Sequence, residues 1–299
     1  MKNRSRQAPM NELHDLMQRV GDLLSRLELM LPSAPRPPDW QVSVAFRWRK
    51  RYGRGFLEPV LHPHHIRLTD LIGIDQQKQL IDQNTRQFVQ GCPANNVLLT
   101  GARGTGKSSL VKAVLKKYAG KGLRLIEIEK HDLLDLPDIV EQVCRRPERF
   151  ILFCDDLSFE ADEPGYKALK AALDGSIAEA SENMLVYATS NRRHLMPEYM
   201  EENLATRHIG EEVHPAEAVE EKISFSERFG LWLSFYPFGQ DDYLGIVDHW
   251  LGFLGMRHAD SDEVRQAAVQ WALSRGSRSG RVAWQFARDW AGRHALKSK

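Results

Sequence analysis

The fold is decided by residues 97–109, which read Val97-Leu98-Leu99-Thr100-Gly101-Ala102-Arg103-Gly104-Thr105-Gly106-Lys107-Ser108-Ser109. The first four are the apolar run of a buried strand, the next eight satisfy the P-loop pattern G-x-x-x-x-G-K-[ST], and the chain continues to Tyr118 as a helix. In such a unit, backbone N–H groups converge on a phosphate at the positive end of the helix. The segment 101–109 therefore predicts a nucleotide-binding loop, in which Lys107 reaches the outer phosphates and the Ser108 hydroxyl ligates Mg²⁺.

Outward from this loop, short apolar runs alternate with helical stretches, a pattern typical of a parallel sheet covered by helices on both faces. The expected strands are Val97–Thr100, Arg124–Ile128, Phe150–Cys154, Met184–Ala188 and Leu231–Phe235. After Gly239 the sequence predicts three helices, Asp241–Leu254, Asp262–Leu273 and Arg281–Leu296. The predicted fold class is α/β: a P-loop NTPase with a three-layer αβα parallel sheet, a small all-helical C-terminal lid domain and an N-terminal helix.

Three parts of the chain are expected. Residues 1–39 form an amphipathic helix and a Pro-rich linker, residues 40–239 an α/β nucleotide-binding domain with an N-terminal extension, and residues 240–299 the helical lid. The apolar stripe of the first helix consists of Leu13, Leu16, Val20, Leu23, Leu27 and Met30. It is too short for a convincing free-standing coiled coil, so docking on its own domain and binding to a partner both stay open.

Two carboxylates follow the buried run Phe150–Cys154. Asp155 is expected to hold hydrated Mg²⁺, and Asp156 to orient or deprotonate the attacking water. The next strand, Met184–Ala188, runs on through Thr189 and Ser190 to Asn191. An apolar strand that ends in two acids is weak evidence alone and strong evidence at this distance from a P-loop.

These motifs resemble those of the AAA+ ATPases over residues 66–290, most closely a group of stand-alone bacterial AAA+-like ATP-binding proteins of unassigned function. The resemblance implies that Asn191 places the water beside the γ-phosphate and that the segment Leu71-Ile72-Gly73-Ile74-Asp75 covers the adenine, with Ile72 and Gly73 as its binding residues. It also implies that Arg281 acts as a lid arginine in cis and Arg228 as an arginine reaching a neighbouring subunit's site. Guanidinium groups stabilise the charge that spreads over the γ-phosphate oxygens. Arg278 or Arg207 are alternatives to either arginine.

The sequence departs from the AAA+ pattern at two places. The second acid is Asp156 where active members usually have Glu, so either turnover is slow or Glu160 shares the role. The stretch between Ile128 and Phe150 has no aromatic–apolar–glycine loop of the kind that grips a threaded polypeptide, which disfavours a protein-threading machine.

Composition restricts the partners. The 299 residues carry 41 Lys and Arg against 40 Asp and Glu, so no overall field favours nucleic acid or an acidic membrane. The basic-aromatic segment 47–56 favours a nucleic-acid loader, but the alternation of Val42, Val44, Phe46 and Trp48 favours a packed strand, which is the preferred interpretation. An odd count of 3 Cys and the lack of a membrane-length apolar run predict a cytoplasmic protein.

The leading prediction is an ATP hydrolase that uses ATP and Mg²⁺ as a nucleotide-dependent homo-oligomer and acts on an unidentified protein partner. The alternatives are a nucleic-acid loader or remodeller and an ATP-gated protein scaffold with little turnover. A GTPase is disfavoured because the residues after Asn191 lack the Asn-Lys-x-Asp pattern that reads guanine.

Overall fold

The computed structural model describes residues 16–23, 37–63, 66–159, 163–174, 182–191, 227–256 and 262–297. Contacts divide the chain into two units, residues 1–37 and residues 38–299. The first unit is described at residues 16–23, which are helical and expose Leu16, Met17, Val20 and Leu23. The other residues of the predicted stripe lie outside the described ranges.

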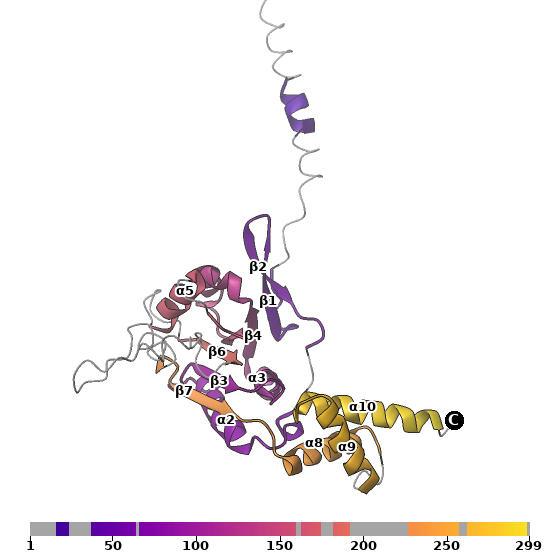
Figure 1. Cartoon of the computed structure of the whole chain (residues 1–299). Helices are drawn as coiled ribbons and strands as arrows, with labels where there is room; N and C mark the ends of the chain where they lie inside the picture. Colours follow the sequence, from indigo (N-terminus) through magenta and orange to yellow (C-terminus); the bar gives the residue numbers. More distant parts are fainter. Residues whose placement is uncertain are drawn as a thin grey trace, which may run out of the picture. The chain divides into compact units, whose positions relative to one another are not determined.

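The second unit is built on a sheet that, in the described part of the chain, has seven strands in the order β2-β1-β4-β5-β6-β3-β7 (Figure 1). Their bounds are β1 Ala45–Arg51, β2 Arg54–Pro59, β3 Val97–Gly101, β4 Leu123–Ile128, β5 Arg149–Cys154, β6 Met184–Ser190 and β7 Leu231–Phe235. β1 and β2 pair antiparallel, and all other neighbours pair parallel. The prediction of a parallel α/β sheet is confirmed.

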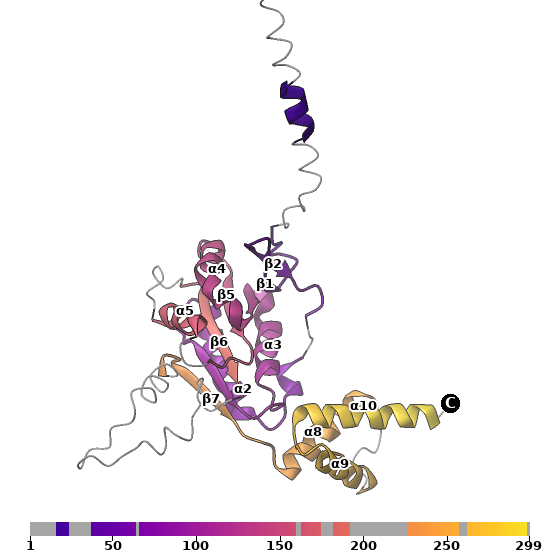
Figure 2. The same ribbon diagram turned by 45° about the horizontal axis from the view of Figure 1, so that its top comes forward.

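Helices cover both faces of this sheet (Figure 2). On one face lie α2 (Asp75–Val89) and α3 (Lys107–Tyr118), and on the other lie the 3-10 helix η3 (Lys130–Asp135), α4 (Leu136–Val143) and α5 (Pro164–Leu173). Residues of β5 alternate between the two cores: Ile151 and Phe153 join the first, and Phe150 and Leu152 the second. Because both faces of β5 are buried, its sequence from Phe150 to Cys154 is continuously apolar.

Among the described residues after β7 there are three helices, as the sequence predicts: α8 (Gln240–Phe253), α9 (Asp262–Ser274) and α10 (Gly280–Lys297). They pack on one another around Tyr243, whose hydroxyl donates to the Ala268 carbonyl at 3.1 Å. The domain boundary expected at residues 239/240 stays a prediction. Among the helices of the described residues, none combines the length and apolar character needed to cross a bilayer.

The hairpin of β1 and β2 shows what the basic-aromatic segment does within the fold. Phe46 and Trp48 are buried, and the Trp48 indole N–H donates to Asp135 at 2.8 Å. Three cations of β1 pair with acids in β4 or after it, namely Arg47 with Glu127, Arg49 with Glu129 and Lys50 with Asp135, each at 2.7 Å. The interpretation as a packed strand is confirmed for Phe46 and Trp48, whereas Val42 is exposed in a turn and Val44 precedes β1. The sequence reading did not identify β2.

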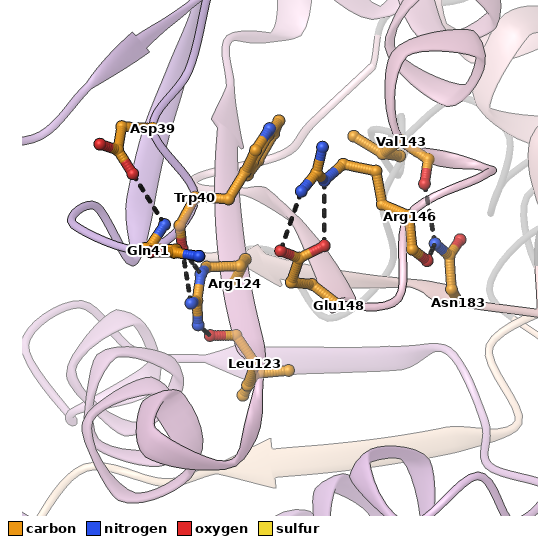
Figure 3. Close-up of polar contacts among 9 residues, drawn as sticks. All are labelled: Asp39, Trp40, Gln41, Leu123, Arg124, Val143, Arg146, Glu148 and Asn183. Carbon is orange, nitrogen blue, oxygen red and sulfur yellow. Dashed lines mark hydrogen bonds and ion pairs between the residues drawn. The ribbon is translucent and has the colours of Figure 1, made fainter.

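Near the start of the second unit, Trp40 packs beside the amino ends of β4 and β5 (Figure 3). The Trp40 ring packs against Phe46 and Phe150, with the guanidinium of Arg146 4.9 Å from its centroid. The Trp40 carbonyl accepts two hydrogen bonds from Arg124, at 2.8 and 2.6 Å. A buried cation thus anchors the entering segment.

Candidate nucleotide site

The glycine-rich loop connects the carboxyl end of β3 to the first turn of α3. Gly106 precedes α3 with a φ of 98°, a left-handed conformation that glycine adopts without steric cost. Gly101 has a φ of 131°, and a Cβ there would lie 1.9 Å from the Phe235 carbonyl oxygen. The Ala102 N–H donates to the same oxygen at 3.3 Å, so the loop lies directly against β7.

Lys107 lies at the centre of the site with its ammonium group inside the loop. Its Nζ donates to the carbonyls of Gly101 at 2.7 Å and Ala102 at 2.8 Å, and to Asn191 Oδ1 at 3.0 Å. Burial lowers the pKa of Lys107 from its usual value, an effect that the charges of Asp155 and Asp156 oppose. The loop therefore holds a desolvated cation among neutral oxygens, where a phosphate would be a stronger partner.

Ser108, Asp155 and Thr189 come together from three elements. The Ser108 hydroxyl donates to Asp155 Oδ1 at 2.5 Å, and the Thr189 hydroxyl donates to the same oxygen at 2.6 Å. These are hydroxyl and carboxylate oxygens, the ligand type that Mg²⁺ prefers. The residues that the sequence predicts for Mg²⁺ are therefore adjacent and chemically suited to it.

Asp156 is held in an unusual backbone conformation beside Asn191. Its φ is 55°, in the left-handed region, and its N–H donates to Thr189 Oγ1 at 2.9 Å. Its carboxylate accepts a hydrogen bond from Asn191 Nδ2, and Arg103 lies 4.0 Å away. Asn191 thus bridges Asp156 and Lys107. Glu160 lies outside the described residues.

The segment predicted to cover the adenine lies against the loop. A Cβ on Gly106 would come within 3.6 Å of Ile74 and 3.8 Å of Leu71. Gly73 has a φ of 77° and lies beside the Phe238 ring. Ile72 is partly buried and packs against the hydrophobic core on the face of the sheet that α2 and α3 cover. Within the predicted segment 71–75, Leu71 and Ile74 are thus the residues that lie against Gly106.

The C-terminal helices reach the loop at the beginning of α10. The Gly280 N–H donates to the Gly104 carbonyl at 2.9 Å, and a Cβ on Gly104 would lie 2.9 Å from Ser279. Arg281 lies in the same turn with its Cβ 3.5 Å from that position, and the exposed Arg278 precedes it. Both arginines thus flank a helix N-terminus that abuts the loop.

Arg228 lies elsewhere, at the amino end of β7. Its Nε donates to Asp174 Oδ1, at the end of α5, at 2.7 Å. Since β7 runs parallel to β3, Arg228 lies at the amino edge of the sheet and the loop at its carboxyl edge, separated by the five residues of β7, about 15 Å at the usual rise of a strand. Arg207 lies outside the described residues.

Sequence reasoning missed Thr189 as part of the site. Its signal was a hydroxyl in a buried strand, two residues before Asn191 and beside a strand that ends in two acids. Whether that hydroxyl turns toward the acids depends on the register of β5 and β6, which the sequence alone does not define.

Residues 41–294 match the family described as "Protein of unknown function (DUF815)", and the chain belongs to that family. No curated protein matches the sequence.

Three solved structures illustrate the structural relatives. The Holliday junction branch migration motor RuvB of Thermotoga maritima is similar with a TM-score of 0.47 and 15% identity over 74% of this chain, which spans 63% of the RuvB chain. A chain of the Escherichia coli MS115-1 HORMA:CdnC:Trip13 complex is similar with a TM-score of 0.46 and 14% identity, over 74% of this chain and 90% of that one. A DNA replication initiation factor has a TM-score of 0.46 and 13% identity, over 73% and 61% of the two chains.

Proposed function

We propose that the protein binds ATP with Mg²⁺ in the glycine-rich loop and hydrolyses it. The observation that carries the proposal is the convergence of Lys107, Ser108, Asp155, Asp156 and Asn191 through direct hydrogen bonds. A loop that merely capped a helix would need neither two acids nor an amide beside its lysine. The expected coupling is between nucleotide state and the position of the lid or of a neighbouring copy.

The roles follow from the contacts. Residues 101–109 hold the phosphates through their backbone N–H groups, and Lys107 exchanges its carbonyl partners for phosphate oxygens. Water attacks the γ-phosphorus as the bond to the bridging oxygen breaks, and Asp156 takes the water's proton. Asn191, already bonded to Asp156, orients that water. Arg281 contributes charge from the lid.

Ser108 and Asp155 would hold Mg²⁺, because their oxygens are adjacent and belong to the class this ion binds. When bound, the ion neutralises charge that develops on the phosphate oxygens. Asp156 is one methylene shorter than Glu, which favours slow turnover.

Arg228 is proposed to act in a second copy of the chain. It lies at the edge of the sheet opposite its own loop, so it cannot reach its own γ-phosphate. A homo-oligomer that assembles in the presence of nucleotide would bring it to a neighbour's site. Such a soluble oligomer fits the proposed cytoplasmic location.

Calorimetry with Mg²⁺ and ATP tests the binding step, and phosphate release tests hydrolysis. Lys107→Ala should abolish both, and unchanged hydrolysis would contradict the assignment. Arg228→Ala should bind ATP but hydrolyse it poorly, and activity should partly return when it is mixed with Lys107→Ala protein. No return would leave Arg228 with a structural role. GTP should bind more weakly than ATP.

A second candidate function is recruitment of a protein partner with little turnover. The observation that favours it is the exposed apolar face of Leu16, Met17, Val20 and Leu23. It predicts tight ATP binding, negligible phosphate release and loss of a co-purifying partner in Leu16→Glu/Leu23→Glu protein.

Nucleic-acid loading is the weaker alternative, because Arg47 and Arg49 are already paired with Glu127 and Glu129. A cavity of about 410 Å³ opens between these residues and Asp155, but its lining carries both signs of charge. Loading predicts salt-sensitive binding of DNA or RNA that is lost when Arg47, Arg49 and Arg51 are neutralised.

A further inference from the structure

The Thr189 hydroxyl is the one side-chain group of the described residues that bonds to both acids of the site. It donates its proton to Asp155 Oδ1 at 2.6 Å and accepts the Asp156 N–H at 2.9 Å. Thr189 is 2% exposed, at the end of β6. A buried hydroxyl has one proton to donate, so this arrangement uses that proton on Asp155 and a lone pair on Asp156.

The two hydrogen bonds of Thr189 constrain the side chain of Asp155 and the backbone of Asp156. The hydroxyls of Ser108 and Thr189 converge on Oδ1 of Asp155, so within the described structure Oδ2 stays free of hydrogen bonds. The bond to Asp156 N–H supports a φ of 55°, which a non-glycine residue adopts only when its surroundings stabilise it. Thr189 therefore fixes the rotation of one carboxylate and the backbone of the other.

Holding the two strands together does not require this hydroxyl. β5 and β6 pair in parallel register up to Cys154 and Ala188, and the Leu157 N–H donates to the Thr189 carbonyl at 2.7 Å. These backbone contacts remain when the side chain changes. A valine of the same shape would fill the same space and remove only the two hydroxyl bonds.

We propose that Thr189 is a positioning residue for the reaction: it orients the Asp155 carboxylate toward the metal and sets the Asp156 carboxylate beside the water. The inference rests on the proposed ATPase function. Residues that orient the groups around a metal typically change metal affinity or activity 10- to 100-fold when they are removed.

The experiment compares Thr189→Val, Thr189→Ser and Thr85→Val in the full chain. Thr85 is the matched control, because it is a fully buried threonine whose hydroxyl bonds to the Ile81 carbonyl at 2.7 Å and to the Tyr187 hydroxyl at 2.9 Å, remote from both acids. The readouts are the Mg²⁺ concentration that gives half-maximal binding of a fluorescent ATP analogue, kcat and KM for ATP, and the melting temperature.

Thr189→Val should raise the half-maximal Mg²⁺ concentration about 10-fold and lower kcat about 10- to 100-fold with a smaller change in KM. Thr189→Ser, which keeps the hydroxyl, should stay within about threefold of the unchanged protein on both. Thr85→Val should lower the melting temperature and leave the Mg²⁺ response and kcat unchanged. That pattern would separate positioning from packing.

Three results would overturn the proposal. A Thr189→Val protein with the original Mg²⁺ response and kcat would show that the hydroxyl is dispensable. A Thr189→Ser protein as impaired as Thr189→Val would assign the loss to packing. If Thr189→Val does not fold, Thr189→Cys, whose thiol is a weaker donor on a side chain of similar volume, replaces it with the same expectations. An unchanged protein that neither binds nor hydrolyses ATP would refute the ATPase function as well.

Discussion

Replacing Arg124 tests whether a buried cation anchors the entry of the chain into the sheet. Arg124 is 9% exposed and makes four hydrogen bonds to backbone carbonyls, of which Figure 3 draws those to Trp40 and Leu123. Two go to Trp40, at 2.8 and 2.6 Å, one to Ala119 at 3.1 Å and one to Leu123 at 2.9 Å. Arg124→Met keeps most of the side-chain volume and removes every donor.

The magnitude follows from which carbonyls lose a partner. The Ala119 carbonyl keeps the Gly122 N–H at 3.2 Å, so the cost falls mainly on Trp40 and Leu123. Leaving a buried acceptor without its charged donor costs about 1–3 kcal/mol each, and relief of the buried charge returns part of that. We expect Arg124→Met to lower the free energy of unfolding by about 2–4 kcal/mol.

Arg146 supplies the matched control on the other side of Trp40. It pairs with Glu148 at 2.9 Å and lies over the Trp40 ring, but its side chain is 35% exposed. Arg146→Met should therefore cost only about 1 kcal/mol. Urea unfolding followed by circular dichroism measures both variants. A loss for Arg124→Met no larger than that for Arg146→Met would refute the anchoring role.

Three further predictions concern stability. Burial, reinforced by Asp82, raises the pKa of Tyr118 to about 12. The neutral phenol therefore contributes up to about 3 kcal/mol to the free energy of unfolding, a contribution that is complete below pH 10 and lost as the pH rises toward 12. Tyr118→Phe should remove that pH dependence from melting curves recorded between pH 8 and 12. A Cβ at Gly55 would lie 1.9 Å from the Trp48 indole, so Gly55→Ala should lower the urea midpoint by the equivalent of about 1–3 kcal/mol, and an unchanged midpoint would contradict the packing of the hairpin. Gly245 lies in the middle of α8, and a Cβ there would meet no atom within 4 Å. Gly245→Ala should therefore raise the free energy of unfolding by about 0.5–1 kcal/mol, measured from the urea midpoint. A lower free energy of unfolding would contradict the open space around this residue.

The strands around the loop were predictable because they are buried on both faces. Each is a run of apolar residues whose bounds in the structure match the sequence reading within two residues. The Lys107 loop was predictable for a different reason: its chemistry needs particular residue types at fixed spacing. Local sequence carries both signals.

The hairpin and Thr189 were less predictable because their meaning depends on partners far away in the chain. Arg47 pairs with a residue 80 positions later, and Trp48 with one 87 positions later. Read alone, an alternation of aromatic residues and cations fits a nucleic-acid surface as well as a packed strand. Only the sheet register brings the acids of β4 and η3 to those cations and thereby decides between the two.

The same long-range packing relates the nucleotide edge of the sheet to Arg228. Lys130, just after β4, pairs with Glu163 at 2.8 Å, at the beginning of α5, and η3 packs along that helix. α5 then runs for 10 residues, about 15 Å, and ends at Asp174, which binds Arg228. One end of α5 is therefore tied to the segment that follows β4, and its other end is tied to Arg228. A displacement of that segment that moves α5 as a rigid body would shift Asp174 and, through it, Arg228.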